Sequence, residues 1–375
     1  MVEFVQAMHF CISVRDGTHD TPKPTDSGYK LVTGKHIKNG QIDPSDAYFI
    51  SEEDYNKINE RSLVEKWDVL MSMIGTVGEV AVVKDVPDYA IKNVALFKCG
   101  GSELKGRWLS YYLRTPFAKG HMSGNQKGSS QQFLSLKQLR ELPVPVVEER
   151  KMLRIIDILS AYDDLIENNQ KQIKLLEEAA QRLYKDWFID LRFPGHESTP
   201  IHDGLPEGWE RKTVTDLLEI KYGKDHKALA DGAIPVYGSG GIMRKVGPVL
   251  YSGESVLIPR KGSLNNILYV AGDFWTIDTM FYSVPKAPNI AKYMYLFLSR
   301  LDMYSFNIGA AVPSMTVKIL DEINVVLPSA EILLLFESVI SPMFEKKRVL
   351  EKQIETALQA RDRLLPKLMG GEIEV

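Results

Sequence analysis

The stretch YDDLIENNQKQIKLLEEAAQRLYKDW, residues 162–187, recurs in altered form as MFEKKRVLEKQIETALQARDRLLPKL, residues 343–368. In both stretches, positions at alternating spacings of four and three form a mostly apolar seam, which is the heptad pattern of a coiled coil. Asn169 is a polar member of the first seam, where one such residue can fix the register. The first seam is Tyr162, Ile166, Asn169, Ile173, Leu176, Ala180, Leu183 and Trp187, and the second is Met343, Lys347, Leu350, Ile354, Ala357, Arg361, Leu364 and Leu368.

Two interpretations of the seams remain open. Each helix could pack only on its own globular domain, or the two helices could pair with each other. We favour pairing, because a heptad seam buries itself against another seam, and an antiparallel pair is the simpler geometry for a chain that returns between its halves. A helix of about 40 residues is about 60 Å long, so such a pair would act as a ruler between two domains.

The repeat extends beyond the helices, so we predict an internal duplication with pseudo-two-fold symmetry. One offset of 181 residues aligns about 55 residues without a gap, which is rarely chance. Upstream of this region the similarity is weaker and needs gaps. The matched pairs include Gly128 with Gly309, Lys137 with Lys318, Glu141 with Glu322, Val144 with Val325, and residues 171–173 with 352–354.

The segment before each helix has the pattern of a mixed α/β domain. In the first half, short β-rich runs at 68–73, 79–83 and 94–99 are separated by Gly, Pro, Asn and Asp, and helical patterns cover 52–60 and 108–119. Pro342 predicts a kink or a late start in the second long helix. The predicted fold class is α+β, with mixed α/β domains at 1–147 and 191–327 (the latter opening with a Gly- and Pro-rich linker), long helices at 148–190 and 328–375, and an antiparallel coiled coil between them.

Composition excludes several classes of protein. The chain has 375 residues, 44% of them hydrophobic, and its 46 basic and 49 acidic side chains give a net charge of −3. Cys11 and Cys99 are too few for a disulfide framework, and no basic leader or long apolar run is seen, so we expect a cytoplasmic protein with no membrane partner. The net negative charge comes from the long helices, because residues 1–150 (19 basic, 19 acidic) and 191–330 (14 of each) are neutral.

No recognisable catalytic motif is present. Residues 28–36 have the wrong spacing for a phosphate-binding loop, and Tyr237–Gly241 reads as a turn because Met243 stands where a dinucleotide loop needs glycine. The histidines are scattered without ligand spacing. We therefore predict that the chain has no catalytic residue, binds no metal or cofactor, and is not an enzyme by itself.

Polar loops are the remaining candidates for function. Residues 105–140 contain seven Lys or Arg and no acidic residue, and inside them lies the amide- and hydroxyl-rich run 123–133. Such groups bond phosphates and base edges, although a solvated polar loop is the simpler alternative. The candidate DNA contacts are Thr18, His19, Lys35, His36, Lys127, Ser129, Ser130, Gln131, Gln132, Ser239, Arg244, Lys245, Arg260, Lys261, Ser263 and Asn265.

A set of short motifs follows in order along nearly the whole chain. The motifs are DGTH (16–19), LPVP (142–145), LPEGW (205–209), IPVYGS (234–239), RKGS (260–263), GDFW (272–275), VLP (326–328) and LLPKLMGGEI (364–373). Each motif alone is modest, but taken in order they resemble those of the specificity subunit of type I restriction-modification enzymes.

The resemblance implies a DNA-binding subunit whose halves each read one part of a bipartite target. It also implies that the helices set the unread spacer and dock two modification subunits, which carry S-adenosylmethionine and methylate adenine. Restriction/translocase subunits that use ATP would join for cleavage. The alternative is an orphan or decoy scaffold that binds partner subunits without productive DNA recognition.

Overall fold

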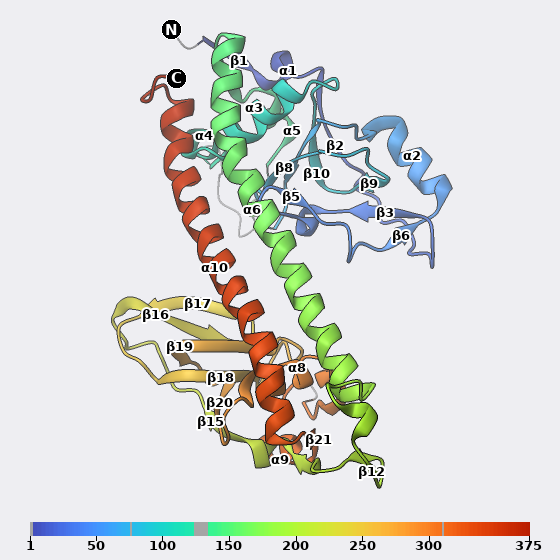
Figure 1. Ribbon diagram of the computed structural model, residues 1–375. Coiled ribbons are helices and arrows are strands. Elements are labelled where there is room, and N and C mark those ends of the chain that lie inside the picture. Colours follow the sequence, from blue (N-terminus) through green and yellow to red (C-terminus); the bar gives the residue numbers. More distant parts are fainter. Residues whose placement is uncertain (1–2, 76, 124–133, 310) are drawn as a thin grey trace. The chain divides into compact units, whose positions relative to one another are not determined.

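The computed structural model describes residues 3–75, 77–123, 134–309 and 311–375 (Figure 1). The chain divides into two compact units. Unit 1 comprises Met1–Asn168 together with Gln353–Val375, and unit 2 comprises Asn169–Lys352. Each unit therefore contains a part of both long helices, and unit 1 is built from both ends of the chain.

Unit 1 is a mixed α/β fold in which two sheets have more than two strands. One has the strand order β2-β10-β7-β8 and is antiparallel, and the other has the order β6-β3-β9, with β3 parallel to β9. Its elements are β1 (Glu3–Gln6), α1 (Ala7–Phe10), β2 (Ser13–Asp16), β3 (Tyr29–Val32), a 3₁₀ turn (Gly34–His36), β4 (Ile37–Lys38), β5 (Gln41–Ile42), β6 (Phe49–Ile50), α2 (Glu52–Ser62), β7 (Val69–Ser72), β8 (Val80–Val82), β9 (Tyr89–Ile91), β10 (Val94–Lys98), α3 (Glu103–Arg114), α4 (Pro116–Ser123), α5 (Leu136–Arg140), β11 (Pro143–Val146) and α6 (Glu149–Tyr184), the last continuing into unit 2.

Unit 2 repeats this plan around one larger sheet of order β15-β20-β18-β19-β16-β17, in which only β16 and β19 are parallel. Its elements are a π-helical turn (Lys185–Ile189), a 3₁₀ turn (His196–Ser198), β12 (Ile201–His202), β13 (Leu205–Pro206), β14 (Glu210–Thr213), α7 (Val214–Leu217), β15 (Leu218–Tyr222), β16 (Asp231–Gly238), β17 (Gly241–Val246), β18 (Tyr251–Pro259), β19 (Leu268–Thr276), β20 (Met280–Pro285), α8 (Ala291–Leu298), a 3₁₀ turn (Met303–Phe306), α9 (Val317–Glu322), β21 (Asn324–Leu327) and α10 (Ala330–Met369), the last continuing into unit 1.

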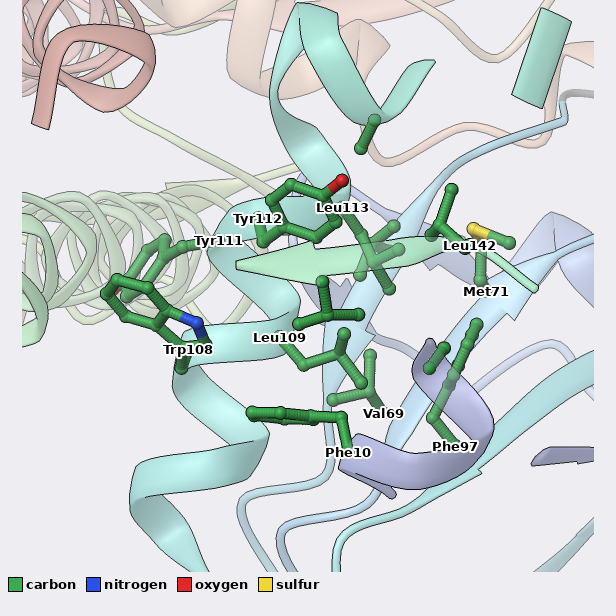
Figure 2. Close-up of a cluster of buried hydrophobic side chains, with 14 of the residues drawn as sticks. Phe10, Val69, Met71, Phe97, Trp108, Leu109, Tyr111, Tyr112, Leu113 and Leu142 are labelled. Atoms are coloured by element: carbon green, nitrogen blue, oxygen red, sulfur yellow. The ribbon is translucent and has the colours of Figure 1, made fainter. Parts of the chain in front are cut away.

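Helix α3 supplies much of the core of unit 1. The Ser102 hydroxyl caps its first turn by accepting a hydrogen bond from the Lys105 amide. Figure 2 shows side chains of α3, among them Trp108 and Leu109, gathered with Phe97 of β10 and Val69 of β7. The predicted helix 108–119 is in fact two helices, because the residue before a proline is disfavoured in helical conformation and Thr115, before Pro116, is extended.

The duplication is confirmed at the level of individual bonds. In unit 1 the Trp108 indole donates to the Pro145 carbonyl, and in unit 2 the Tyr293 hydroxyl donates to the Val326 carbonyl. The two accepting residues, Pro145 and Val326, are 181 positions apart. Likewise, β1 pairs with β11 just before α6, and β14 pairs with β21 just before α10. The two units are therefore copies of one plan.

The seams of the long helices are the less exposed faces of α6 and α10, and none of their sixteen residues is exposed. In unit 1, Arg361 Nη1 lies 2.6 Å from Asp163 Oδ1. In unit 2, Lys347 Nζ lies 2.6 Å from Glu177 Oε1. Since the early part of α6 meets the late part of α10, and the late part of α6 meets the early part of α10, the pair is antiparallel, as predicted (Figure 1).

The expectation that the second long helix starts late, at Pro342, is wrong. Helix α10 begins at Ala330 and continues through Pro342. A proline inside a helix costs about 3 kcal/mol through its missing N–H and its clash with the preceding turn. Phe336 and Ile340, just before it, are fully buried in the unit 2 core. Their burial, at about 1.5–3 kcal/mol per large apolar side chain, outweighs that cost.

Candidate nucleic-acid interface

Five loops of unit 2 are joined by hydrogen bonds into one surface, which we call loop cluster 2. The Lys224 amide donates to the Thr276 carbonyl at 2.8 Å. The Ile277 amide donates to the Tyr237 carbonyl at 3.0 Å, and the Arg260 amide donates to the Thr279 carbonyl at 2.8 Å. The Gly262 amide donates to the Pro313 carbonyl (2.9 Å) and the Asn266 side chain to the Ser239 carbonyl (2.8 Å). The cluster comprises residues 223–227, 239–240, 260–267, 277–279 and 307–314, of which 310 is not described.

Loop cluster 2 brings together Ser239, Arg260, Lys261, Ser263 and Asn265, five of the seven candidates in the second half. Asn265 is already engaged, since its side chain accepts from the Met303 amide (2.7 Å) and donates to Asp302 (3.2 Å). Ser263 is exposed and Lys261 half-buried. Ser239 lies in the β16–β17 hairpin turn, so the predicted turn at 237–241 is confirmed.

Arg260 has the most organised side chain of the cluster. Its Nη1 donates to the Asp278 carbonyl at 2.9 Å, and its guanidinium lies over the ring of Tyr222 at 5.5 Å from the centroid. Tyr222 is 55% exposed and meets the buried Phe281 ring edge-on at 5.0 Å. The arginine is thus held in place at the surface by an aromatic support that is anchored in the core.

The other two candidates of unit 2 lie on strand β17 and not in the cluster. Arg244 is half-buried and donates to the Leu229 carbonyl and to Asp231 Oδ1, both at 2.8 Å. These contacts give it a structural role in joining β17 to the start of β16. Lys245 is exposed on the same strand.

Unit 1 carries an equivalent surface, loop cluster 1, which comprises residues 17–20, 33–36, 73–78 except 76, and 91–93. The Thr18 amide donates to the Ile91 carbonyl (3.0 Å) and the Lys92 amide to Val32 (2.9 Å), the counterparts of two bonds in loop cluster 2. The Leu134 amide donates to the Met73 carbonyl in unit 1, and the Met315 amide donates to the Arg260 carbonyl in unit 2. Met73 is therefore the counterpart of Arg260, and it is buried in the core.

Thr18 and His19 both lie in loop cluster 1. The His19 ring is exposed and held at both nitrogens, by Asn93 Oδ1 (2.7 Å) and Asp16 Oδ2 (3.0 Å). Asp16 is buried and also accepts from Arg61. This network fixes the direction in which His19 faces solvent.

Lys35 and His36 differ in exposure. Lys35 is exposed and pairs with Asp46 at 3.1 Å. His36 is 3% exposed, and its Nδ1 accepts from the Thr33 amide at 2.8 Å. Burial lowers the pKa of His36, which favours a neutral ring. The structure places His36 in the interior of the turn, where a base edge or phosphate could not reach it without rearrangement.

The basic stretch 105–140 is largely engaged within unit 1. Lys105 donates to the Phe10 carbonyl, Arg107 pairs with Glu103 at 2.7 Å, and Arg140 donates to the Val14 carbonyl. Arg114 lies 3.5 Å from Asp163. Lys127, Ser129, Ser130, Gln131 and Gln132 lie outside the described residues, so their contact with DNA stays a prediction.

Sequence reasoning missed Tyr222, the support of Arg260, and Asn93, the partner of His19. The structure aligns Gly17 with Gly223, because a side chain at either would approach the backbone of the neighbouring turn, at Ile91 O (2.3 Å) and Ile277 O (2.0 Å). That equivalence needs an offset other than 181. A gapped self-comparison anchored on these glycines would have drawn attention to Tyr222.

The described residues show no cluster of His, Cys, Asp or Glu able to hold a metal ion. None of the helices within the described ranges is long and apolar enough to cross a membrane. Within the described part of the chain, the two loop clusters present hydrogen-bond donors and acceptors at the surface.

Comparison with known proteins agrees with this geometry. The family described as type I restriction modification DNA specificity domain matches residues 18–178 and again 206–360. The type I restriction enzyme MjaIX specificity subunit of Methanocaldococcus jannaschii is 27% identical over 83% of this chain and 78% of its own length. The HindI specificity subunit of Haemophilus influenzae is 19% identical over 64% of this chain and 71% of its own length.

A solved structure shares the fold. The S subunit of a type I restriction-modification system from M. genitalium aligns with a TM-score of 0.58 and 18% identity over 98% of this chain and 96% of its own. The resemblance found in the sequence is thus confirmed, as is the non-catalytic role, since the matched family confers specificity. The chain belongs to the type I restriction-modification DNA specificity domain family and carries two copies of that domain.

Proposed function

We propose that this chain is the DNA-reading subunit of a type I restriction-modification complex, and that each unit reads one part of a two-part target. The observation that carries the proposal is the presence of two equivalent loop clusters, built by the same backbone hydrogen bonds, in a chain with two specificity domains. Loops held by a rigid scaffold are the usual place for recognition groups. Amide, hydroxyl and guanidinium groups supply the chemistry that distinguishes base pairs in the major groove.

The long helices would set the unread gap between the two parts. At 1.5 Å per residue, the 36 residues of α6 and the 40 of α10 are about 54 and 60 Å long. We also propose that they dock two modification subunits, with restriction/translocase subunits joining for cleavage. S-adenosylmethionine and ATP would then be bound by those partners.

Mapping of methylated adenines tests the proposal. The chain is co-expressed with a modification subunit of its own system in a host without adenine methylation, and the methylated sites are read across the genome. A two-part motif with a fixed gap is the expected result. If a stable complex forms but marks no motif, the chain acts as a scaffold or decoy and the proposed function is wrong.

A further inference from the structure

We propose that Arg260 is a specificity-determining residue that reads a guanine in the half-site of unit 2, and that Tyr222 is its positioning residue. This inference rests on the proposed function and deepens it. It names one base contact where the family assignment names none.

The first step is the free hydrogen-bonding capacity of Arg260. Only Nη1 is engaged, by the Asp278 carbonyl at 2.9 Å. Among the described residues, Nε and Nη2 have no hydrogen-bond partner and no carboxylate forms an ion pair with the side chain. A guanidinium has five donors, so four N–H groups remain available, and two of them in its fork match O6 and N7 of guanine.

The second step is preorganisation. Tyr222 supports the guanidinium face, and Phe281, which is fully buried, supports Tyr222. Stacking and the Asp278 bond hold the side chain before DNA arrives, so less conformational entropy is lost on binding. A flexible lysine would lack both the stack and the fork.

The third step is the contrast with other basic groups. Arg244 is already bound to Asp231 and the Leu229 carbonyl. Lys224, Lys227 and Lys261 belong to the same loop cluster as Arg260 and have no ion-pair partner among the residues that the structure describes. Point charges of this kind suit phosphates, which position a protein but carry no sequence information.

The fourth step is the asymmetry between the two units. The counterpart of Arg260 in unit 1 is Met73, a core residue with no donor. A change at Arg260 must therefore alter one part of the target and leave the other part as it was.

The test uses the full complex with the modification subunit. Methylated motifs are compared for the wild type, Arg260→Gln, Arg260→Lys and Arg300→Gln. Arg300 is an exposed arginine of the same unit outside loop cluster 2, so its variant is the matched control. We expect Arg260→Gln and Arg260→Lys to lose the requirement for one G·C pair in a single half-site, while Arg300→Gln keeps the wild-type motif.

A second measurement shows whether the contact is direct. Binding of the complex is measured on duplexes that carry guanine or 7-deazaguanine, which lacks the N7 acceptor, at the affected position. Because 7-deazaguanine keeps O6, the wild type should lose one bond of the pair, a loss smaller than the roughly 5- to 150-fold expected for a whole bidentate pair, and Arg260→Gln should show no such loss. Tyr222→Ala should weaken the discrimination, and Tyr222→Phe should keep it.

Several outcomes would overturn the inference. One is an unchanged motif with Arg260→Gln, and another is full wild-type specificity with Arg260→Lys, which would mark a charge contact to phosphate. If Arg260→Gln abolishes marking, the duplex assay decides: equal affinity of the wild type for the guanine and 7-deazaguanine duplexes rejects the contact. Absence of any two-part motif in the wild type would instead reject the proposed function and this inference with it.

Discussion

At the scale of single residues, Gly17 and Gly223 determine how closely each loop cluster closes. A Cβ atom at these positions would lie 2.3 Å from Ile91 O and 2.0 Å from Ile277 O, well inside contact distance. We expect Gly223→Ala to displace its loop and to weaken or broaden recognition of only the half-site of unit 2, and Gly17→Ala to do so for the other half-site. Methylome mapping of both variants checks this, with Gly247→Ala as a control because that residue lies outside loop cluster 2 and its Cβ would come no closer than 3.9 Å to a neighbouring atom. Equal damage to both half-sites would contradict independent reading.

The buried Lys292 gives a prediction for stability. Its Nζ lies 2.5 Å from Glu254 and 2.6 Å from Glu337, and the side chain is only 9% exposed. Burial alone would lower the pKa of Lys292, but the two carboxylates outweigh burial and raise it. Lys292→Met leaves both carboxylates without their partner and should lower the free energy of unfolding by about 3 kcal/mol.

Urea unfolding measures this effect. Lys318→Met, at an exposed position on α9, is the control and should change the free energy of unfolding by less than about 0.5 kcal/mol. A Lys292→Met chain as stable as the control would mean that methionine packing replaces the ion pairs without loss.

What the sequence could predict at this scale was the residue type, and what it could not predict was the engagement of each side chain. Arg244 and Arg260 look equally free in the sequence. Pairing of the hairpin strands β16 and β17 places Arg244 against Asp231, whereas the fold of unit 2 places Arg260 on Tyr222. The burial of His36 could not be predicted either, because the sequence does not show that its ring accepts from the Thr33 amide and lies 3.2 Å from Asp46.

At the scale of elements, the helix pair can be lengthened without disturbing the loops. The Glu177–Lys347 pair sets an antiparallel register in which Ile173 faces Glu351. We expect insertion of seven residues after Ile173, matched by seven after Glu351, to lengthen the gap of the target by roughly three base pairs, since a heptad adds about 10 Å. Both half-sites should keep their bases.

Methylome mapping of the double insertion reads both quantities at once. An insertion in α6 alone breaks the register and serves as the control, with loss of marking expected. New half-sites combined with the old gap would show that the helices do not measure the target.

The helices could be predicted because their periodicity is local, and it remains visible within each stretch of sequence. The sheets could be predicted only as β-rich runs. The parallel contact of β3 with β9, and of β16 with β19, joins segments separated by long loops, and no local pattern encodes such pairing. The late helix start predicted from Pro342 was wrong for a related reason. The burial of Phe336 and Ile340 in the core of unit 2 outweighs the local preference of proline against a helix.

At the scale of the whole molecule, the charge distribution predicts dependence on partners. Both globular segments are neutral, the net charge is −3, and most basic residues of the stretch 105–140 are engaged internally. Since phosphate contacts supply much of the affinity for DNA, the isolated chain should bind its own target weakly and the full complex tightly. Titration of both with one labelled duplex at physiological salt checks this, and nanomolar binding by the isolated chain would contradict it.

Part of the core of unit 1 comes from residues that follow the whole of unit 2 in the chain, and this has a consequence for how the protein is made. Unit 2 is a continuous internal segment, whereas Leu365, Leu368 and Met369 of α10 belong to the core of unit 1. During translation, the domain that begins first is therefore completed last. A prematurely terminated chain would keep a finished second domain beside a first domain with exposed core residues, a form that cellular proteases readily remove. Only chains that include the end of α10 would then persist to direct modification.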